Sequence, residues 1–191
     1  VSGGSKRTKT WAGVTAEEMV RARKPLEQAD PLPPAACLDE DVHARETDQI
    51  LRKSWLPLAR IDQIATPGDF VSLDLFGQPV MVVHGHDGEV RVMSRTCLHR
   101  AALLADGNGN RKLFTCPYHA WTYRPDGSLK KVPQAFGFPC LNKAESGLRR
   151  LAAVERAGLV WVVADPALAD SDIDDHLDPL MAELETLDLS S

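Results

Sequence analysis

Short stretches in which apolar and polar residues alternate recur along the chain from about Trp55 onward. Val71–Leu75 alternates, Val80–Val83 is apolar throughout, and Glu89–Val92 alternates again. Alternation predicts strands with one buried face, and a short apolar run is typical of a strand buried on both faces. Further strands are predicted at residues 113–115, 121–123, 129, 152–155 and 159–163. Many short strands at even spacing predict a mainly β, antiparallel body.

Residues with turn chemistry separate these strands. Phe76–Pro79 and Asp87-Gly88 each lie between two strand-like stretches. Further turns are predicted at Gly107–Asn110, Asp126-Gly127 and Ala157-Gly158, where Gly supplies the backbone freedom that tight turns need.

The first 54 residues have a helical pattern instead. Thr15–Glu18 has the sequence of a capping box, which predicts a helix running toward Lys24. A second helix is expected over residues 39–54, because acidic residues open this segment and basic residues close it. We therefore expect a helical lead-in over residues 11–54, preceded by a disordered tag or tail over residues 1–10.

The last segment, residues 166–191, has an apolar stripe at helical spacing with acidic residues on the other face. The stripe consists of Leu177, Leu180, Met181, Leu184 and Leu187. Asp178-Pro179 is a suitable N-cap and first turn for the main part of this helix. Such a stripe needs a packing partner, so the tail either folds back on the β body or begins a further domain.

Length, composition and charge exclude several classes of protein. The chain has 191 residues and a net charge of −5, and it has no apolar run near the roughly 20 residues that span a bilayer. Nine acidic residues and no Lys or Arg lie in the last 27, which leaves +4 for residues 1–164. That charge is far short of a nucleic-acid-binding footprint. We expect neither a membrane nor a nucleic acid as partner.

Cysteine usage favours the cytoplasm. Four Cys in a chain of this length do not make a disulfide framework. Two of them, Cys37 and Cys140, stand alone in Pro-rich loops and are interpreted as isolated thiols. The N-terminal sequence lacks the apolar segment of a signal peptide and is interpreted as a processed end.

The strongest chemical signal is a pair of Cys-His clusters that follow two strand-like stretches. Cys97 and His99 form the first, and Cys116 and His119 form the second. Two thiolates and two neutral imidazoles suit either a tetrahedral zinc or a [2Fe–2S] cluster with both Cys on one iron and both His on the other. Structural zinc sites favour Cys-Cys and His-His pairs, whereas mixed pairs suit two unlike irons, because each loop then contacts both.

The pattern C-x-H-x₁₆-C-x₂-H resembles the Rieske [2Fe–2S] motif. The surrounding residues, Cys97–Arg100 and Cys116–Tyr123, are similar to the large (α) subunits of Rieske non-haem iron oxygenases. These are the aromatic-ring-hydroxylating dioxygenases of aromatic hydrocarbon catabolism and their monooxygenase relatives. The resemblance runs from about Trp55 to Asp165. It implies a Rieske-type antiparallel β-sandwich with cluster-binding loops over residues 55–165.

Three details favour the oxygenase branch. Respiratory Rieske proteins carry an extra Cys in each loop, and this chain has none there. They also have a Ser two residues after the second His, where this chain has Trp121. Fewer donors to the cluster sulfurs imply a potential toward the low end of the Rieske range. Rieske ferredoxins are shorter and lack the helical lead-in. Ala101 departs from the pattern, because the family often has Gly there.

The resemblance implies a function in electron transfer. Electrons from a ferredoxin or reductase would enter at His99 and His119 and pass to a mononuclear Fe(II) in a catalytic domain of the same or a neighbouring subunit, in a trimer. That iron needs two further His and a carboxylate, and His176 is the only His after His119. We therefore expect no catalytic residue in this chain, and we expect that the chain alone hydroxylates no substrate. The acidic tail is interpreted as the start of an absent catalytic domain. The alternatives are a stand-alone Rieske-type ferredoxin and a structural zinc protein.

Residues beside the ligands are candidate cluster surroundings. Trp121 and Tyr123 are expected to shield the cluster or to pack the core, and Tyr118 to cover the cluster. Arg100 is expected to bind a partner, to pair with a carboxylate, or to lie at the surface without either role. His84 and His86 lie near a strand end, where we expect them to face solvent rather than form a second metal site.

Overall fold

The computed structural model describes residues 9–11, 14–187 and 189. The chain divides into two compact units, Val1–Arg52 and Lys53–Ser191, and each is described by itself. None of the helices in the described ranges has the length and apolar character needed to cross a membrane.

The first unit begins with the short antiparallel pair β1 (Lys9–Trp11) and β2 (Val14–Thr15), followed by helix α1 (Ala16–Ala22). The predicted capping box is confirmed. The Thr15 hydroxyl accepts a hydrogen bond from the Glu18 amide at 3.2 Å, and the Glu18 carboxylate accepts one from the Thr15 amide at 2.8 Å. These bonds satisfy amides that the first helical turn leaves unpaired.

The rest of this unit is helical but more divided than predicted. A 3₁₀ turn (Leu26–Gln28) and the short helix α2 (Ala35–Leu38) precede α3 (Glu40–Gln49). The Asp39 carboxylate caps α3 by accepting hydrogen bonds from the amides of residues 41 and 42. The helix expected over residues 39–54 ends at Gln49 and gives way to a 3₁₀ turn (Leu51–Lys53), a common ending for an α-helix. Of the predicted tail, residues 1–8 lie outside the described residues, whereas Lys9 and Thr10 belong to β1.

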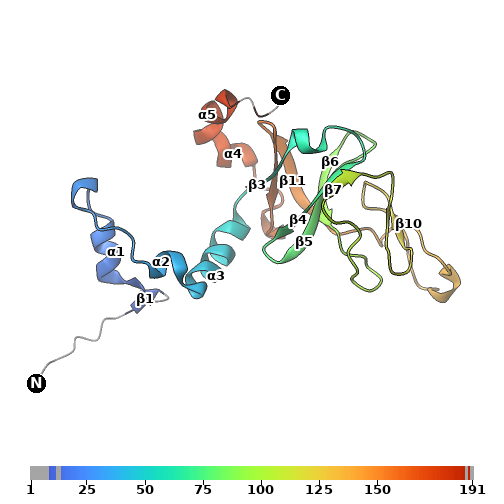
Figure 1. Cartoon of the computed structure of the whole chain (residues 1–191), viewed down its shortest axis with the longest axis horizontal. Coiled ribbons are helices and arrows are strands. Elements are labelled where there is room, and N and C mark those ends of the chain that lie inside the picture. Colours follow the sequence, from blue (N-terminus) through green and yellow to red (C-terminus); the bar gives the residue numbers. More distant parts are fainter. Residues whose placement is uncertain (1–8, 12–13, 188, 190–191) are drawn as a thin grey trace, which may run out of the picture. The chain divides into compact units, whose positions relative to one another are not determined.

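The second unit is built on a seven-stranded sheet in which every neighbouring pair is antiparallel (Figure 1). Its strands, in spatial order, are β3 (Leu56–Arg60), β12 (Leu159–Val163), β11 (Arg150–Arg156), β6 (Val90–Ser94), β5 (Gln78–His84), β4 (Asp69–Leu75) and β7 (Asn108–Asn110). A 3₁₀ turn (Ile61–Ile64) follows β3. The mainly β, antiparallel prediction is thus confirmed.

Strand β7 corrects one turn prediction. Gly107–Asn110 was expected to be a turn, but Asn108–Asn110 pairs with β4 at the sheet edge, with Gly109 opposite Phe70. Its residues have low strand propensity, so the pairing with β4, and not the local sequence, makes it a strand.

A second, three-stranded sheet carries the candidate site. It consists of β8 (Phe114–Thr115), β9 (Thr122–Tyr123) and β10 (Leu129–Lys131), in the order β10-β9-β8. A shared core joins the two sheets, and it includes Phe70, Met81, Val83 and Met93 from the large sheet and Phe114, Tyr123 and Leu129 from the small one. The Phe70 and Phe114 rings meet edge to face at 5.4 Å. This packing of sheet on sheet agrees with the predicted sandwich.

Strand β5 contributes to both cores of the second unit. Met81 and Val83 point toward the small sheet, whereas Val80 and Val82 pack on the opposite face against residues of β12. All four are at most 1% exposed. The uninterrupted apolar run in the sequence therefore reflects burial on both faces.

The tail corrects a second prediction. Instead of one helix beginning at Asp178-Pro179, the structure has α4 (Ile173–Leu177), a 3₁₀ turn (Asp178–Leu180) and α5 (Met181–Thr186). Asp172 is the N-cap of α4 and accepts a hydrogen bond from the amide of residue 174. The break follows from Pro179, which has no amide hydrogen for an α-helical bond.

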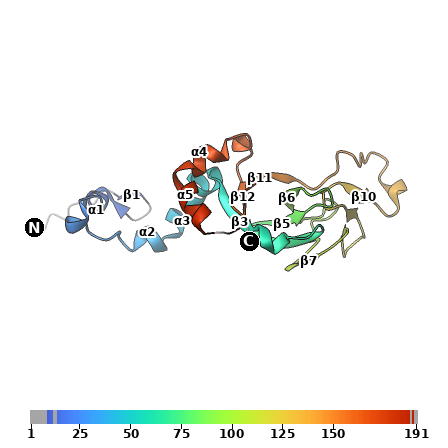
Figure 2. The same ribbon diagram turned by 90° about the horizontal axis from the view of Figure 1, so that it is seen from above.

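The tail packs on the β body, one of the two outcomes expected for its apolar stripe. Ile173 and Leu177 are buried against Trp55 and Trp161, and the Trp55 indole donates a hydrogen bond to Ser171 at 3.1 Å. Figure 2 shows α4 and α5 beside β3 and β12, away from β10.

Candidate metal centre

The first Cys-His cluster lies in a loop that backbone hydrogen bonds close on itself. The Ala101 amide donates to the Cys97 carbonyl at 3.0 Å, and the Cys97 amide donates to the Ala102 carbonyl at 2.9 Å. Ala101 has a φ of +57°, in the left-handed region that Gly adopts more easily. A Gly would adopt this conformation without strain, and the Ala removes no candidate ligand.

The second loop repeats this backbone arrangement between β8 and β9. The Ala120 amide donates to the Cys116 carbonyl at 3.0 Å, and the Cys116 amide donates to the Trp121 carbonyl at 2.8 Å. Ala120 has a φ of +58°, nearly the value at the equivalent position of the first loop. Two loops of the same shape thus present one Cys and one His each.

The two thiols are buried together. Cys97 and Cys116 are 1% and 3% exposed, and both belong to the core between the sheets. Burial, with a further contribution from the Cys116 thiol, raises the pKa of Cys97 above its usual value. A bound metal would therefore have to displace the protons, as thiolate ligation requires.

The two imidazoles meet on the outer side of the same loops. The His99 and His119 rings are 4.6 Å apart, with planes inclined at 68°. The Nδ1 atom of each ring is buried and has no hydrogen-bond partner. Buried polar nitrogens are seldom left unpaired, so two of them on neighbouring rings are suited to bind a metal. Burial, followed by the charges of His119 and Arg100, lowers the pKa of His99 and favours the neutral ring that ligates metals.

The four donors fit a two-iron cluster. They form a pair of thiols and a pair of imidazole nitrogens, so each iron would receive two protein ligands. Among the residues that the structure describes, no group of three or more His, Cys, Asp or Glu side chains is placed to hold one metal ion by itself.

Aromatic rings enclose the imidazoles. Trp121, 4% exposed, lies parallel to His99 with ring centres 5.1 Å apart, and Phe138 contacts both rings edge to face at 5.5 and 5.3 Å. Tyr118 lies 3.8 Å from His119 but is 60% exposed. Of the three candidate neighbours, Trp121 and Tyr118 thus contact the imidazoles, while Arg100 is exposed beside His99.

Tyr123, expected to shield the cluster or to pack the core, also makes polar contacts at the site that the sequence did not predict. Its hydroxyl oxygen lies 3.5 Å from the Cys97 sulfur and accepts a hydrogen bond from the Leu98 amide at 3.1 Å. Burial, reinforced by the nearby Cys97, raises the pKa of Tyr123, so the hydroxyl keeps its proton for the sulfur. Trp121 and Tyr123 lie two residues apart, and both belong to the core between the sheets.

The other His and Cys residues considered from the sequence lie outside the two ligand loops. His84 Nδ1 is 2.8 Å from the Ile64 carbonyl, and His86 lines a surface cavity. Cys37 and Cys140 are exposed thiols without a disulfide.

Comparison with known proteins identifies the domain. Residues 54–142 match the family described as the Rieske [2Fe-2S] domain. This part of the chain is a Rieske domain. The match favours the cluster over the zinc alternative, because Rieske domains bind a [2Fe–2S] centre.

Relatives of the Rieske domain include subunits of two kinds of oxygenase. The chain is 35% identical over 148 residues to the chlorobenzene dioxygenase subunit alpha of Cupriavidus sp. (strain PS12), covering 76% of this chain and 33% of that subunit. It is 33% identical over 125 residues to the carnitine monooxygenase oxygenase subunit of Acinetobacter pittii (strain PHEA-2), covering 65% and 34%. The chain thus spans about a third of the length of these relatives.

A solved structure shows the same fold. The crystal structure of naphthalene 1,2-dioxygenase from Rhodococcus sp. bound to indole has a TM-score of 0.74 and 31% identity, covering 82% of this chain and 36% of that one. The chain therefore carries a Rieske domain of the kind found in the N-terminal part of oxygenase α subunits.

Proposed function

We propose that this chain is the electron-transfer part of a Rieske oxygenase, with Cys97 and Cys116 as ligands of one iron and His99 and His119 as ligands of the other. The observation that carries the proposal is the pair of buried, unpartnered Nδ1 atoms on two imidazole rings in contact, beside two buried thiols. When bound, the [2Fe–2S] cluster supplies one-electron redox chemistry.

The surrounding residues protect and tune this site. Trp121 and Phe138 keep water from the inner face of His99, and Tyr123 offers a hydrogen bond to the Cys97 sulfur. Tyr118 and Arg100 lie on the exposed side, where a partner protein would approach. The chain itself contributes ligands, shielding and a docking surface, and no residue for oxygen activation.

The partners follow from the same proposal. A ferredoxin or reductase supplies the electron, and a mononuclear Fe(II) in a catalytic domain, of the same or a neighbouring subunit of a trimer, receives it. Support comes from the α subunits of dioxygenases and the carnitine monooxygenase subunit among the relatives. A reducing compartment, the cytoplasm, suits the free thiols. Ring hydroxylation or a related monooxygenation would be the activity of the whole enzyme.

A redox titration of the iron-loaded chain with matched cysteine variants tests the proposal. We expect a one-electron midpoint toward the low end of the Rieske range, about −150 to +300 mV. Cys116→Ser should abolish the visible absorption of the cluster, whereas Cys140→Ser, at an exposed thiol, should leave it unchanged. A cluster retained in Cys116→Ser, or lost in both variants, would contradict the ligand assignment.

A further inference from the structure

A basic cavity lies at the end of the cluster hairpin opposite to the candidate ligands. Strand β8 begins at Phe114 and leads to Cys116, and β9 ends at Tyr123. Just beyond these two ends is a surface cavity of about 400 Å³. It is lined by His86, Lys112, Leu113, Arg124, Pro125 and Lys130, and we call it the basic pocket.

Positive charge is concentrated in the segment of the chain that carries the candidate ligands. Residues 95–150 contain ten Lys and Arg but three Asp and Glu, a net charge of +7, whereas the whole chain carries −5. The rest of the chain is therefore strongly acidic. This segregation gives the Rieske domain a localised positive potential that would attract and orient an acidic partner.

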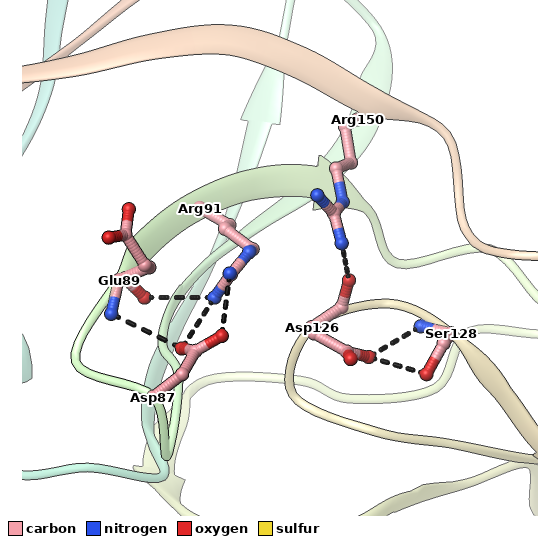
Figure 3. A network of polar contacts seen from close by, with 6 residues as sticks. All are labelled: Asp87, Glu89, Arg91, Asp126, Ser128 and Arg150. Carbon is pink, nitrogen blue, oxygen red and sulfur yellow. Dashed lines mark hydrogen bonds and ion pairs between the residues drawn. The ribbon is translucent and has the colours of Figure 1, made fainter.

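The two acidic residues beside the basic pocket form hydrogen bonds or an ion pair with neighbouring residues. Asp87 and Asp126 line an adjoining hollow, and Asp87 is bound by both terminal nitrogens of Arg91 at 2.7 and 2.8 Å (Figure 3). The Asp126 carboxylate accepts two hydrogen bonds from Ser128, and Arg150 donates to the Asp126 carbonyl. Arg124 donates to the Ser128 hydroxyl at 3.2 Å and interacts with the charge of Asp126, whereas Lys112 and Lys130 are exposed and form no ion pair with a described residue.

The basic pocket also has the composition of a protein-binding surface. Leu113 and Pro125 are apolar and less exposed than the three cations around them. An apolar centre with a polar, charged rim is the usual anatomy of an interface between proteins.

Two short routes connect the basic pocket to the thiol ligands. Leu113 lies three residues before Cys116, about 10 Å along an extended chain. Arg124 follows Tyr123, whose hydroxyl lies 3.5 Å from the Cys97 sulfur. A carrier in the basic pocket would therefore approach the thiol side of the site, and the imidazole side would remain free for the acceptor.

We propose that the basic pocket is the docking surface for an acidic one-electron carrier protein. This proposal rests on the electron-transfer function proposed above. The reduced carrier loses one electron and the oxidised site gains it, with no bond formed or broken. The electron would then enter from the thiol side of the site, and not at His99 and His119 as expected from the resemblance.

Charge reversals that differ only in position test this assignment. Lys112→Glu/Lys130→Glu alters the basic pocket, and Lys143→Glu/Arg149→Glu makes the same change in net charge at exposed residues outside it. Arg100→Glu alters the imidazole side. The probe is an acidic plant-type [2Fe–2S] ferredoxin, and stopped-flow absorbance measures the rate at which its reduced form bleaches the cluster. Dithionite, a small reductant, is the control for an intact, reducible cluster.

We expect the pocket variant to be reduced by the ferredoxin about tenfold more slowly at low salt, and the control pair to be reduced almost as fast as wild type. Carbodiimide crosslinking, which needs no electron transfer, should join ferredoxin carboxylates to Lys112 or Lys130. Equal slowing of both pairs, slowing by Arg100→Glu alone, or crosslinks that avoid both lysines would overturn the proposal. Failure of dithionite to bleach the wild type would instead count against the proposed function, while the crosslinks would still report on docking.

Discussion

The indole of Trp121 lies parallel to the imidazole of His99, with planes 3° apart and ring centres separated by 5.1 Å. The indole is buried and the imidazole is half-buried, so the stack covers the inner face of a candidate ligand. Phe138 closes the same side by contacting both rings. The site is therefore enclosed on one side and reachable on the other.

Removing this stack should make the cluster easier to lose. Aromatic pairs contribute about 1 kcal/mol beyond area burial, so Trp121→Leu should speed loss of visible absorption in the presence of an iron chelator about fivefold or more. Trp161→Leu is the control, because Trp161 is buried in the separate core beneath the tail. Equal acceleration in both variants would show that overall stability, and not the stack, protects the cluster.

Tyr123 should set part of the reduction potential. A hydrogen bond to a cluster sulfur favours the more negative, reduced state, so Tyr123→Phe should lower the midpoint by about 40 mV, equivalent to about 1 kcal/mol for one electron. Tyr118→Phe removes a hydroxyl from a largely exposed ring and should leave the midpoint unchanged. Protein-film voltammetry measures both, and an unchanged midpoint in Tyr123→Phe would contradict the role assigned to its hydroxyl.

The left-handed backbone at Ala101 predicts a stabilising substitution. An L-residue at a φ of +57° is strained, and Gly is not. Ala101→Gly should therefore raise the free energy of unfolding by about 1 kcal/mol. Ala153→Gly, the same change within β11, should lower it by about 0.5–1 kcal/mol. Urea denaturation of the two variants measures both changes. Destabilisation by Ala101→Gly would contradict the claim that the backbone at Ala101 is strained.

The ion pair of Asp87 and Arg91 predicts a dependence of stability on pH. The hydrogen bonds and charge of Arg91 hold the pKa of Asp87 well below its usual value. A carboxylate with a lowered pKa stabilises the fold above its unfolded pKa, about 4, and that stabilisation is lost as the pH falls through the folded value. Asp87→Asn should cost about 0.5–1 kcal/mol at pH 7. In urea titrations the difference from wild type should shrink below pH 4, and a constant difference would contradict this origin.

The sequence predicts what depends on local chemistry. The capping box at Thr15–Glu18 and the buried strand at Val80–Val83 followed from spacing and composition, and both are present. The four candidate ligands were found because Cys and His at such spacing seldom occur together outside metal sites. The structure brings these four together, with the thiols buried and the imidazole rings in contact.

What the sequence missed depends on contacts between distant segments. Phe138 reaches His99 from a loop 39 residues later, and no local pattern marks it. Strand β7 exists through its pairing with β4. The apolar stripe predicts one helix across residues 177–187, whereas a 3₁₀ turn that contains Pro179 divides α4 from α5.

Pulsed EPR of the iron-loaded chain, prepared with ¹⁵N-histidine, tests the central claim most directly. We predict no signal in the oxidised protein and a signal after one-electron reduction, with strong hyperfine couplings from two imidazole nitrogens, as expected when His99 and His119 bind the same iron. A reduced protein without a signal, or a signal without those two nitrogen couplings, would contradict the assignment of these four residues to a Rieske cluster.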